Sequence, residues 1–126
     1  MPVATRGAVK HLSGEDLRGL GASVVLSNTY HLMLRPGAAL LRRLGGLHRL
    51  MDWSGPMLTD SGGFQVYSLA RLRTITDRGV TFADPQSGRR HHLTAELALQ
   101  VQAAIGSDLR MVLDECVGYP ATRAQL

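Results

Sequence analysis

The residues best suited to carry chemistry lie in one short segment, TDSGGFQ at positions 59–65. A short apolar run precedes it, so Asp60 is predicted to lie at the end of a strand, where barrel and open-sheet enzymes place their catalytic groups. Two glycines permit a sharp turn and let a ligand approach the backbone. The ring of Phe64 offers a flat face to a planar ligand. A turn in which Asp60 only caps a backbone N–H group is the alternative interpretation.

Polar residues follow two other apolar runs in the same way. The cluster SNTYH at 27–31 comes directly after the run 23–26, and DEC at 114–116 comes after the run 109–113. The continuous run 23–26 is typical of a parallel strand that is buried on both faces. Right-handed crossovers place the ends of parallel strands along one edge of a sheet. We therefore expect Asn28, Asp60 and Asp114 to converge.

The chain alternates strands with helices. Four strands of a parallel sheet are expected, at 2–5, 23–26, 57–59 and 109–113. Two arms, 80–82 and 89–93, are predicted to form a hairpin around a turn at 84–88, which interrupts the alternation and is interpreted as an insertion. This pattern predicts an α/β fold: either a (β/α)₈ barrel, with its active site where the strands end, or a three-layer open sheet.

Three helices carry start and stop signals. Ser13 and Thr94 are predicted N-caps, Ser13 as part of a capping box with Asp16, and Pro36 lies near the start of the second helix. Glycines follow all three helices and are expected to end them. The predicted apolar faces are Leu40, Leu41 and Leu44 on the second helix, and Leu97, Val101, Ala104 and Ile105 on the third. Residues 118–126 are expected to form a loop that runs into a further helix.

Length and composition limit the class of protein. The 126 residues can form one domain with a modest core. The net charge of +4, from 14 Lys and Arg against 10 Asp and Glu, permits an RNA partner without requiring one. A single cysteine excludes an internal disulfide and fits a reducing compartment. The sequence shows neither an apolar run of roughly 20 residues nor a signal peptide, so we expect a cytoplasmic protein without membrane contact.

Three segments together resemble the tRNA-guanine transglycosylase family, the queuine tRNA-ribosyltransferases. These segments are SNTYHLMLRPG at 27–37, TDSGGFQV at 59–66, and DEC at 114–116 followed by YP at 119–120, and they occur in the family's order. Residues 1–3, 44–48 and 106–108 also match, so the resemblance extends over essentially the whole chain. It favours the barrel over the open sheet.

The resemblance implies a partial (β/α)₈ TIM barrel, about the first four βα units with an inserted β-hairpin. Because such a barrel needs roughly 250 residues, residues 1–126 are expected to be an incomplete barrel domain, a fragment. A half-barrel leaves strand edges unpaired, and we expect the apolar runs 24–26 and 111–113 to be exposed. The isolated chain is therefore predicted to be poorly folded and catalytically inert.

The resemblance also implies an activity: exchange of guanine at the wobble position of a tRNA anticodon for queuine or its precursor base, by a double-displacement transglycosylation. Such glycosyl transfers commonly use two carboxylates. Asp60 matches the family's catalytic aspartate that acts in proton transfer, while the nucleophilic aspartate lies beyond Leu126. Asp114 matches the base-binding aspartate, which can accept hydrogen bonds from the donors on the edge of guanine. The other substrate-binding residues that the resemblance implies are Ser61, Gly62, Gly63, Phe64 and Asn28, together with Asp60.

The implied partners are the anticodon loop of tRNA and a 7-deazaguanine base, and a homodimer of the complete enzyme is left open. The family's zinc site uses three closely spaced cysteines and a distant histidine. Cys116 is the single cysteine of this chain. We therefore expect neither a zinc site nor another cofactor within these residues.

Two other classes of function stay open. One is non-catalytic: a fragment, or a weak RNA-binding or partner-binding module. The other is a metal-dependent hydrolase on the same barrel, suggested by Asp60 and Asp114 alone, which needs a histidine–carboxylate cluster that the sequence does not supply. His91 and His92 are expected on opposite faces of a strand, so they cannot share a metal ion there. Cys116 is not expected to act as a nucleophile.

Overall fold

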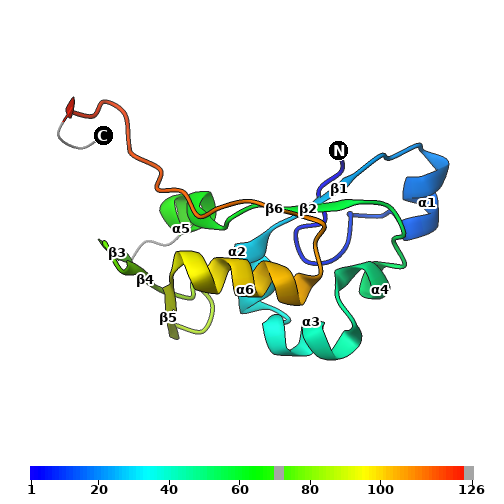
Figure 1. Cartoon of the computed structure of the whole chain (residues 1–126), viewed down its shortest axis with the longest axis horizontal. Coiled ribbons are helices and arrows are strands. Elements are labelled where there is room, and N and C mark those ends of the chain that lie inside the picture. The colour runs from blue at the N-terminus through cyan, green and yellow to red at the C-terminus, as the bar shows by residue number, and fades with distance from the viewer. Residues whose placement is uncertain (70–72, 124–126) are drawn as a thin grey trace.

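The computed structural model describes residues 1–69 and 73–123 and shows a mixed α/β fold with two sheets (Figure 1). Strands β1 (Val25–Ser27), β2 (Met57–Thr59) and β6 (Leu109–Arg110) form a parallel sheet in that order. A parallel bridge between Val3 and Leu26 adds the start of the chain beside β1. The four parallel segments predicted from the sequence are therefore neighbours in chain order.

Three of these segments are shorter or shifted relative to the prediction. The first, at 2–5, makes a single bridge, and the second begins at Val25. The last ends at Arg110 rather than continuing to 113. The expected burial of the second strand on both faces is wrong, because Leu26 lies half-buried between two buried neighbours. The covered face of the sheet is the one that carries those neighbours.

The helices are α1 (Gly14–Gly19), α2 (Thr29–Leu34), α3 (Ala38–Leu44), α4 (Leu47–Met51), α5 (Gly63–Leu69) and α6 (Ala95–Ile105). The predicted N-caps are confirmed: Ser13 and Asp16 form a capping box, and the Thr94 side chain caps α6. Both α3 and α6 end at a left-handed glycine, Gly45 and Gly106. Three helices, α2, α4 and α5, were not predicted, because they begin in polar or glycine-rich segments without a cap signal.

Four helices, α2, α3, α4 and α6, lie on one side of the parallel sheet (Figure 1). The apolar face predicted for α6 is confirmed, since its residues are buried or packed against the core. The face predicted for α3 is largely wrong, because Leu41 is buried while Leu40 and Leu44 are exposed. The short α3 turns one leucine toward the core, and its other two leucines face solvent.

The predicted hairpin is confirmed and carries a third strand. β4 (Gly79–Ala83) and β5 (Arg90–Leu93) pair antiparallel, and β3 (Arg73–Thr76) pairs with the other side of β4. β3 was not predicted from the sequence. Every residue of this strand is exposed, and a strand without a buried face does not show the apolar alternation that marks a half-buried strand. The insertion is therefore a small three-stranded sheet.

An ion pair joins this small sheet to the end of α2. Arg35 donates to Asp84 at 2.6 Å, and Asp84 is only 5% exposed. The Ser87 hydroxyl, the Gln86 N–H group and the Arg35 charge together lower the pKa of Asp84 to about 2. Within the small sheet the two histidines of β5 lie on opposite faces, as predicted: one ring stacks on Phe82 and the other contacts a threonine hydroxyl.

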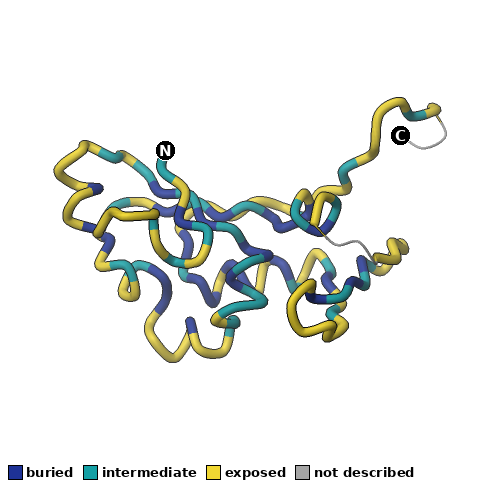
Figure 2. The backbone as a smooth tube through the Cα atoms, turned by 180° about the vertical axis from the view of Figure 1, so that it is seen from behind, coloured by how far each residue is buried: buried dark blue, intermediate teal, exposed yellow. Residues whose placement is uncertain are grey.

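The segment 111–123 is largely exposed, and its last part, 117–123, runs away from the body of the molecule (Figure 2). Met111 and Val112 are exposed, as predicted. Val25 is fully buried, so the expected exposure of the run 24–26 is wrong at its centre. The helix expected at 118–126 falls partly on residues 124–126, outside the described residues. None of the described helices has the length and apolar character to cross a membrane.

Candidate active site

Asp60 follows β2 and is held by the two residues that follow β1. Asn28 Nδ2 donates to Asp60 Oδ2 at 2.5 Å, and the Thr29 N–H group donates to Asp60 Oδ1 at 2.8 Å. The Thr29 hydroxyl donates to the Asp60 carbonyl oxygen at 2.5 Å. Thr29 opens α2, so its N–H group lacks a partner within the helix and Asp60 supplies one. Asp60 therefore caps this helix through Oδ1, while the Asn28 amide fixes Oδ2.

Asp114 is held at the same edge of the sheet by Ser61. The Ser61 hydroxyl donates to Asp114 Oδ1 at 2.6 Å and accepts from the Gly63 N–H group at 3.1 Å. Ser61 directly follows Asp60, so this contact joins the end of β2 to the segment after β6. The predicted convergence of Asn28, Asp60 and Asp114 is confirmed.

The two glycines after Ser61 are required by contacts within the chain. Gly62 has φ of +86°, a conformation that favours glycine. A Cβ atom on Gly63 would lie 2.4 Å from the Asp114 carbonyl oxygen and 2.9 Å from Asp114 Oδ1. Gly63 thus allows α5 to begin directly against Asp114. The close backbone approach predicted for a ligand is made in this structure by the chain itself.

Among the described residues, the hydrogen-bond donors to the two carboxylates are uncharged groups. Cys116 Sγ donates to Asp114 Oδ2 at 3.6 Å. Burial and the Asp114 charge raise the pKa of the Cys116 thiol, which disfavours the nucleophilic thiolate. Beside Asp60, burial and the Arg6 charge lower the pKa of His31 against the opposing effect of Asp60. The His31 imidazole is therefore uncharged near neutral pH.

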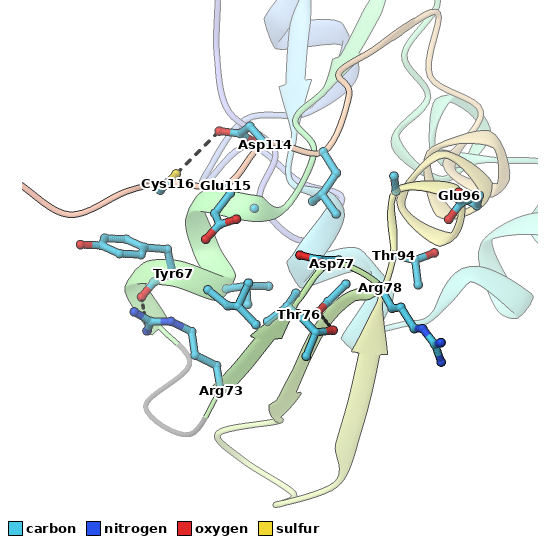
Figure 3. A pocket seen from close by; sticks show the side chains of 17 residues that line it. Tyr67, Arg73, Thr76, Asp77, Arg78, Thr94, Glu96, Asp114, Glu115 and Cys116 are labelled. Carbon is cyan, nitrogen blue, oxygen red and sulfur yellow. Dashed lines mark hydrogen bonds between the residues drawn. The ribbon is translucent and has the colours of Figure 1, made fainter. Parts of the chain in front are cut away.

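A pocket of about 590 Å³ lies on the hairpin side of Asp114 (Figure 3). Its walls come from the start of α5, the turn between β3 and β4, the start of α6 and residues 113–116. Asp114 lines this pocket, whereas Asp60, Asn28 and Phe64 do not. Phe64 is the second residue of α5 and is 59% exposed, which leaves its ring available to a planar ligand.

Two residues that hold the site were missed by sequence reasoning. Thr29 makes two bonds to Asp60, and its place inside the polar cluster 27–31 was the available signal. Gln102 is fully buried on α6 and bonds to the backbone of Met111, shortly before Asp114. The signal there is an amide side chain within the buried face of a helix.

The described residues do not provide a metal site. Among residues 1–69 and 73–123, no group of three or more His, Cys, Asp and Glu side chains could hold a metal ion. The zinc site implied by the resemblance does not fit these residues, because it needs three cysteines and residues 1–126 contain one, Cys116. A metal-dependent hydrolase gains no support from this part of the chain.

Comparisons with known proteins agree with one another. The family model described as queuine tRNA-ribosyltransferase matches residues 1–126. A relative of that name from Desulforudis audaxviator is 57% identical over 122 residues, covering 97% of this chain and 33% of the relative. Those from Solidesulfovibrio magneticus and Moorella thermoacetica are each 56% identical, covering 98% and 97% of this chain and 33% of each relative. The chain spans about a third of the length of these curated relatives.

Proposed function

Because the chain belongs to the queuine tRNA-ribosyltransferase family, we propose that residues 1–126 supply the proton-transfer and base-recognition groups of a tRNA-guanine transglycosylase. The reaction exchanges guanine at the wobble position of a tRNA anticodon for queuine or its 7-deazaguanine precursor. The observation that carries this proposal is the arrangement of two carboxylates, Asp60 and Asp114, joined through Ser61 at the edge where the strands end.

Asp60 is the proposed proton-transfer group. Breaking an N-glycosidic bond leaves an oxocarbenium-like sugar and a base that must gain a proton. Asn28 and Thr29 fix both oxygens of Asp60 through neutral donors, so the carboxylate is oriented without being neutralised by a cation. The covalent step needs a second carboxylate as nucleophile, and the proposal assigns that group to a part of the enzyme outside residues 1–126.

Asp114 is the proposed base-binding group. Guanine presents a ring N–H group and an exocyclic amine side by side, and a carboxylate can accept from both. Ser61 and Cys116 each donate one hydrogen bond to an oxygen of Asp114. Asp114 is still exposed and lines the pocket, so its carboxylate can accept further hydrogen bonds. The ring of Phe64 would stack on the bound base. To reach it, the base must leave its stacked position in the RNA, which costs little free energy in a single-stranded anticodon loop.

The fold proposed for the whole enzyme is a (β/α)₈ barrel in which the parallel sheet forms the first strands. Val3, β1, β2 and β6 are neighbours in chain order, with helices on one side. Leu26 and Leu58 point to the uncovered face and are half-buried, as residues facing a barrel interior would be before it closes. The position of Asp60 and Asp114 at the strand ends matches the face that carries chemistry in such barrels.

The proposal is tested in a chimera in which residues 1–126 replace the matching third of the Desulforudis relative. Asp60→Asn should reduce the exchange of labelled guanine into tRNA by about 10³-fold, the range expected for loss of a general acid–base group. An asparagine at 60 can still accept from the Thr29 N–H group, and Asn28 can rotate its amide to keep the second bond. The variant should therefore keep its melting temperature.

Asp52→Asn is the matched control, since the Asp52 side chain is 91% exposed on a different part of the surface. It should leave the exchange rate unchanged. Exchange by Asp60→Asn at the rate of the unsubstituted chimera would remove Asp60 from the mechanism. An unsubstituted chimera that folds but exchanges no guanine would reject the proposed function.

A further inference from the structure

The side chain of Gln102, on α6, binds the backbone of Met111, the first residue after β6. Its Nε2 donates to the Met111 carbonyl oxygen at 2.8 Å, and its Oε1 accepts from the Met111 N–H group at 2.9 Å. The Thr59 hydroxyl also lies 2.9 Å from Gln102 Oε1. Gln102 is fully buried, and a buried amide left without partners would be costly.

The backbone partners fix which way this amide points. A carbonyl oxygen can only accept and an N–H group can only donate, so Nε2 must face the Met111 carbonyl and Oε1 the Met111 N–H group. The Thr59 hydroxyl can then donate to Oε1 at 2.9 Å, which is nearer than its other acceptor, the Leu109 carbonyl oxygen at 3.5 Å. The Thr59 oxygen lies 2.7 Å from the Ser107 hydroxyl, which can donate to it in turn.

The two ends of this network lead directly to the two carboxylates. Thr59 immediately precedes Asp60, and Met111 lies three residues before Asp114. Regular strand pairing of β6 ends at Arg110, and the chain beyond it is extended and exposed. Met111 is also tied to β2 by its N–H group, which lies 3.2 Å from the Thr59 carbonyl oxygen. Gln102 thus holds Met111 by its backbone, and beyond it Leu113 packs against the hydrophobic cluster that includes Tyr30 and Val66.

We propose that Gln102 is a positioning residue that sets the separation of Asp60 and Asp114 by holding Thr59 and Met111 together. This inference deepens the function proposed above and rests on it for the role of the carboxylates. Without the Gln102 amide, the segment 111–114 is held to β2 by the single Met111 backbone bond and by Ser61. Misplacement of Asp114 then weakens recognition of the base more than it slows the chemical step.

The test uses the chimera that carries residues 1–126. Gln102→Met keeps the length and packing of the side chain but has no amide. Gln102→Glu keeps an acceptor for Thr59 and for the Met111 N–H group, and places a second oxygen against the Met111 carbonyl. Both variants should raise KM for the free base about tenfold and change kcat less than about threefold. Amide hydrogen exchange at 109–114 should become faster in both.

Two controls separate positioning from stability. Gln100→Met makes the same change at an exposed position on the same helix and should alter neither KM nor exchange at 109–114. Val101→Ala, at a residue 2% exposed in the core, should lower the melting temperature without raising KM.

An unchanged KM in a folded Gln102 variant, or loss of folding in both variants, would overturn the inference, because Gln102 would then be inert or merely structural. An unsubstituted chimera without exchange activity would reject the proposed function, while hydrogen exchange at 109–114 would still decide whether Gln102 holds the segment. Unchanged protection there in both variants would overturn the inference by itself.

Discussion

The two edges of the parallel sheet hold their carboxylates in different ways. At the edge where the strands begin, Asp108 accepts from the Met57 N–H group at 2.8 Å and lies 3.1 Å from His48 Nε2, a group that can become a cation. At the edge where the strands end, Asp60 and Asp114 bond only to neutral groups: an amide, a backbone N–H, a hydroxyl and a thiol. Among the described residues no ion pair involves either of them.

This difference indicates what each edge is for. Asp60 and Asp114 are oriented by hydrogen bonds from uncharged side chains and backbone, whereas Asp108 also lies beside the imidazole of His48. Parallel barrels generally carry chemistry where strands end and stability where they begin. Substitutions at the edge where the strands end should therefore affect base exchange. Those at the edge where the strands begin should affect folding.

The largest expected effect concerns residues 1–126 on their own. In the isolated chain, the carboxylates at the edge where the strands end should not support base exchange. β6 lies at an edge of the described sheet, and Met111 and Val112 beside it are exposed. The reaction also needs a second carboxylate at the sugar carbon. We expect exchange of labelled guanine at background level and thermal unfolding without a cooperative transition.

A cooperative transition in the monomer would contradict the folding half of this prediction. Exchange above background that disappears in Asp60→Ala would contradict the catalytic half. The nucleophile would then have to lie within these residues.

A pair of glycine substitutions compares the two edges directly. In Gly63→Ala the new Cβ atom would meet the Asp114 carbonyl oxygen, so kcat/KM for base exchange in the chimera should fall by about 100-fold. In Gly46→Ala the Cβ atom would lie 3.0 Å from the Ile105 carbonyl oxygen, and the residue has φ of +89°. This variant should lose about 1–3 kcal/mol of unfolding free energy while keeping kcat/KM within about threefold.

Steady-state kinetics and thermal denaturation of the same preparations measure both quantities. Equal losses of kcat/KM in the two variants, at temperatures where both are folded, would remove the distinction between the edges.

The smallest expected effect is on how the melting temperature depends on pH, through Asp108 at the edge where the strands begin. The Met57 N–H group, followed by the His48 charge, lowers the pKa of Asp108 from its usual value of 3.8. A carboxylate with a lowered pKa in the folded state stabilises the protein above its unfolded pKa, and this contribution is lost as the pH falls below that value. The melting temperature of Asp108→Asn should therefore drop about 1 °C less than that of the unsubstituted chimera between about pH 6 and about pH 3.

Asp52→Asn serves as the control for this measurement, because it removes a carboxylate whose ion pair with Arg18 is exposed, and such surface pairs contribute little to stability. An Asp108→Asn variant that loses as much melting temperature on acidification as the unsubstituted chimera would show that Asp108 makes no such contribution.

Features set by a few neighbouring residues could be predicted from the sequence. The capping box of Ser13 and Asp16, the cap at Thr94 and the left-handed glycine at Gly106 each depend on contacts within one turn of a helix. The edge that carries Asp60 was also predictable, because apolar runs followed by polar clusters mark the ends of parallel strands. The same local reasoning failed for β3, which is exposed throughout, and for α5, which begins within the glycine pair.

The sequence by itself thus determined which residues reach the functional edge and which local signals shape the ends of helices. Only the tertiary structure decided how those residues are held. Gly63 is required by the backbone of Asp114, and the buried amide of Gln102 binds both backbone polar groups of Met111. Thr29 is fixed by Asp60 across two strand ends. Each role depends on the distance between elements far apart in the chain, and that distance is set by the packing of the helices on the sheet.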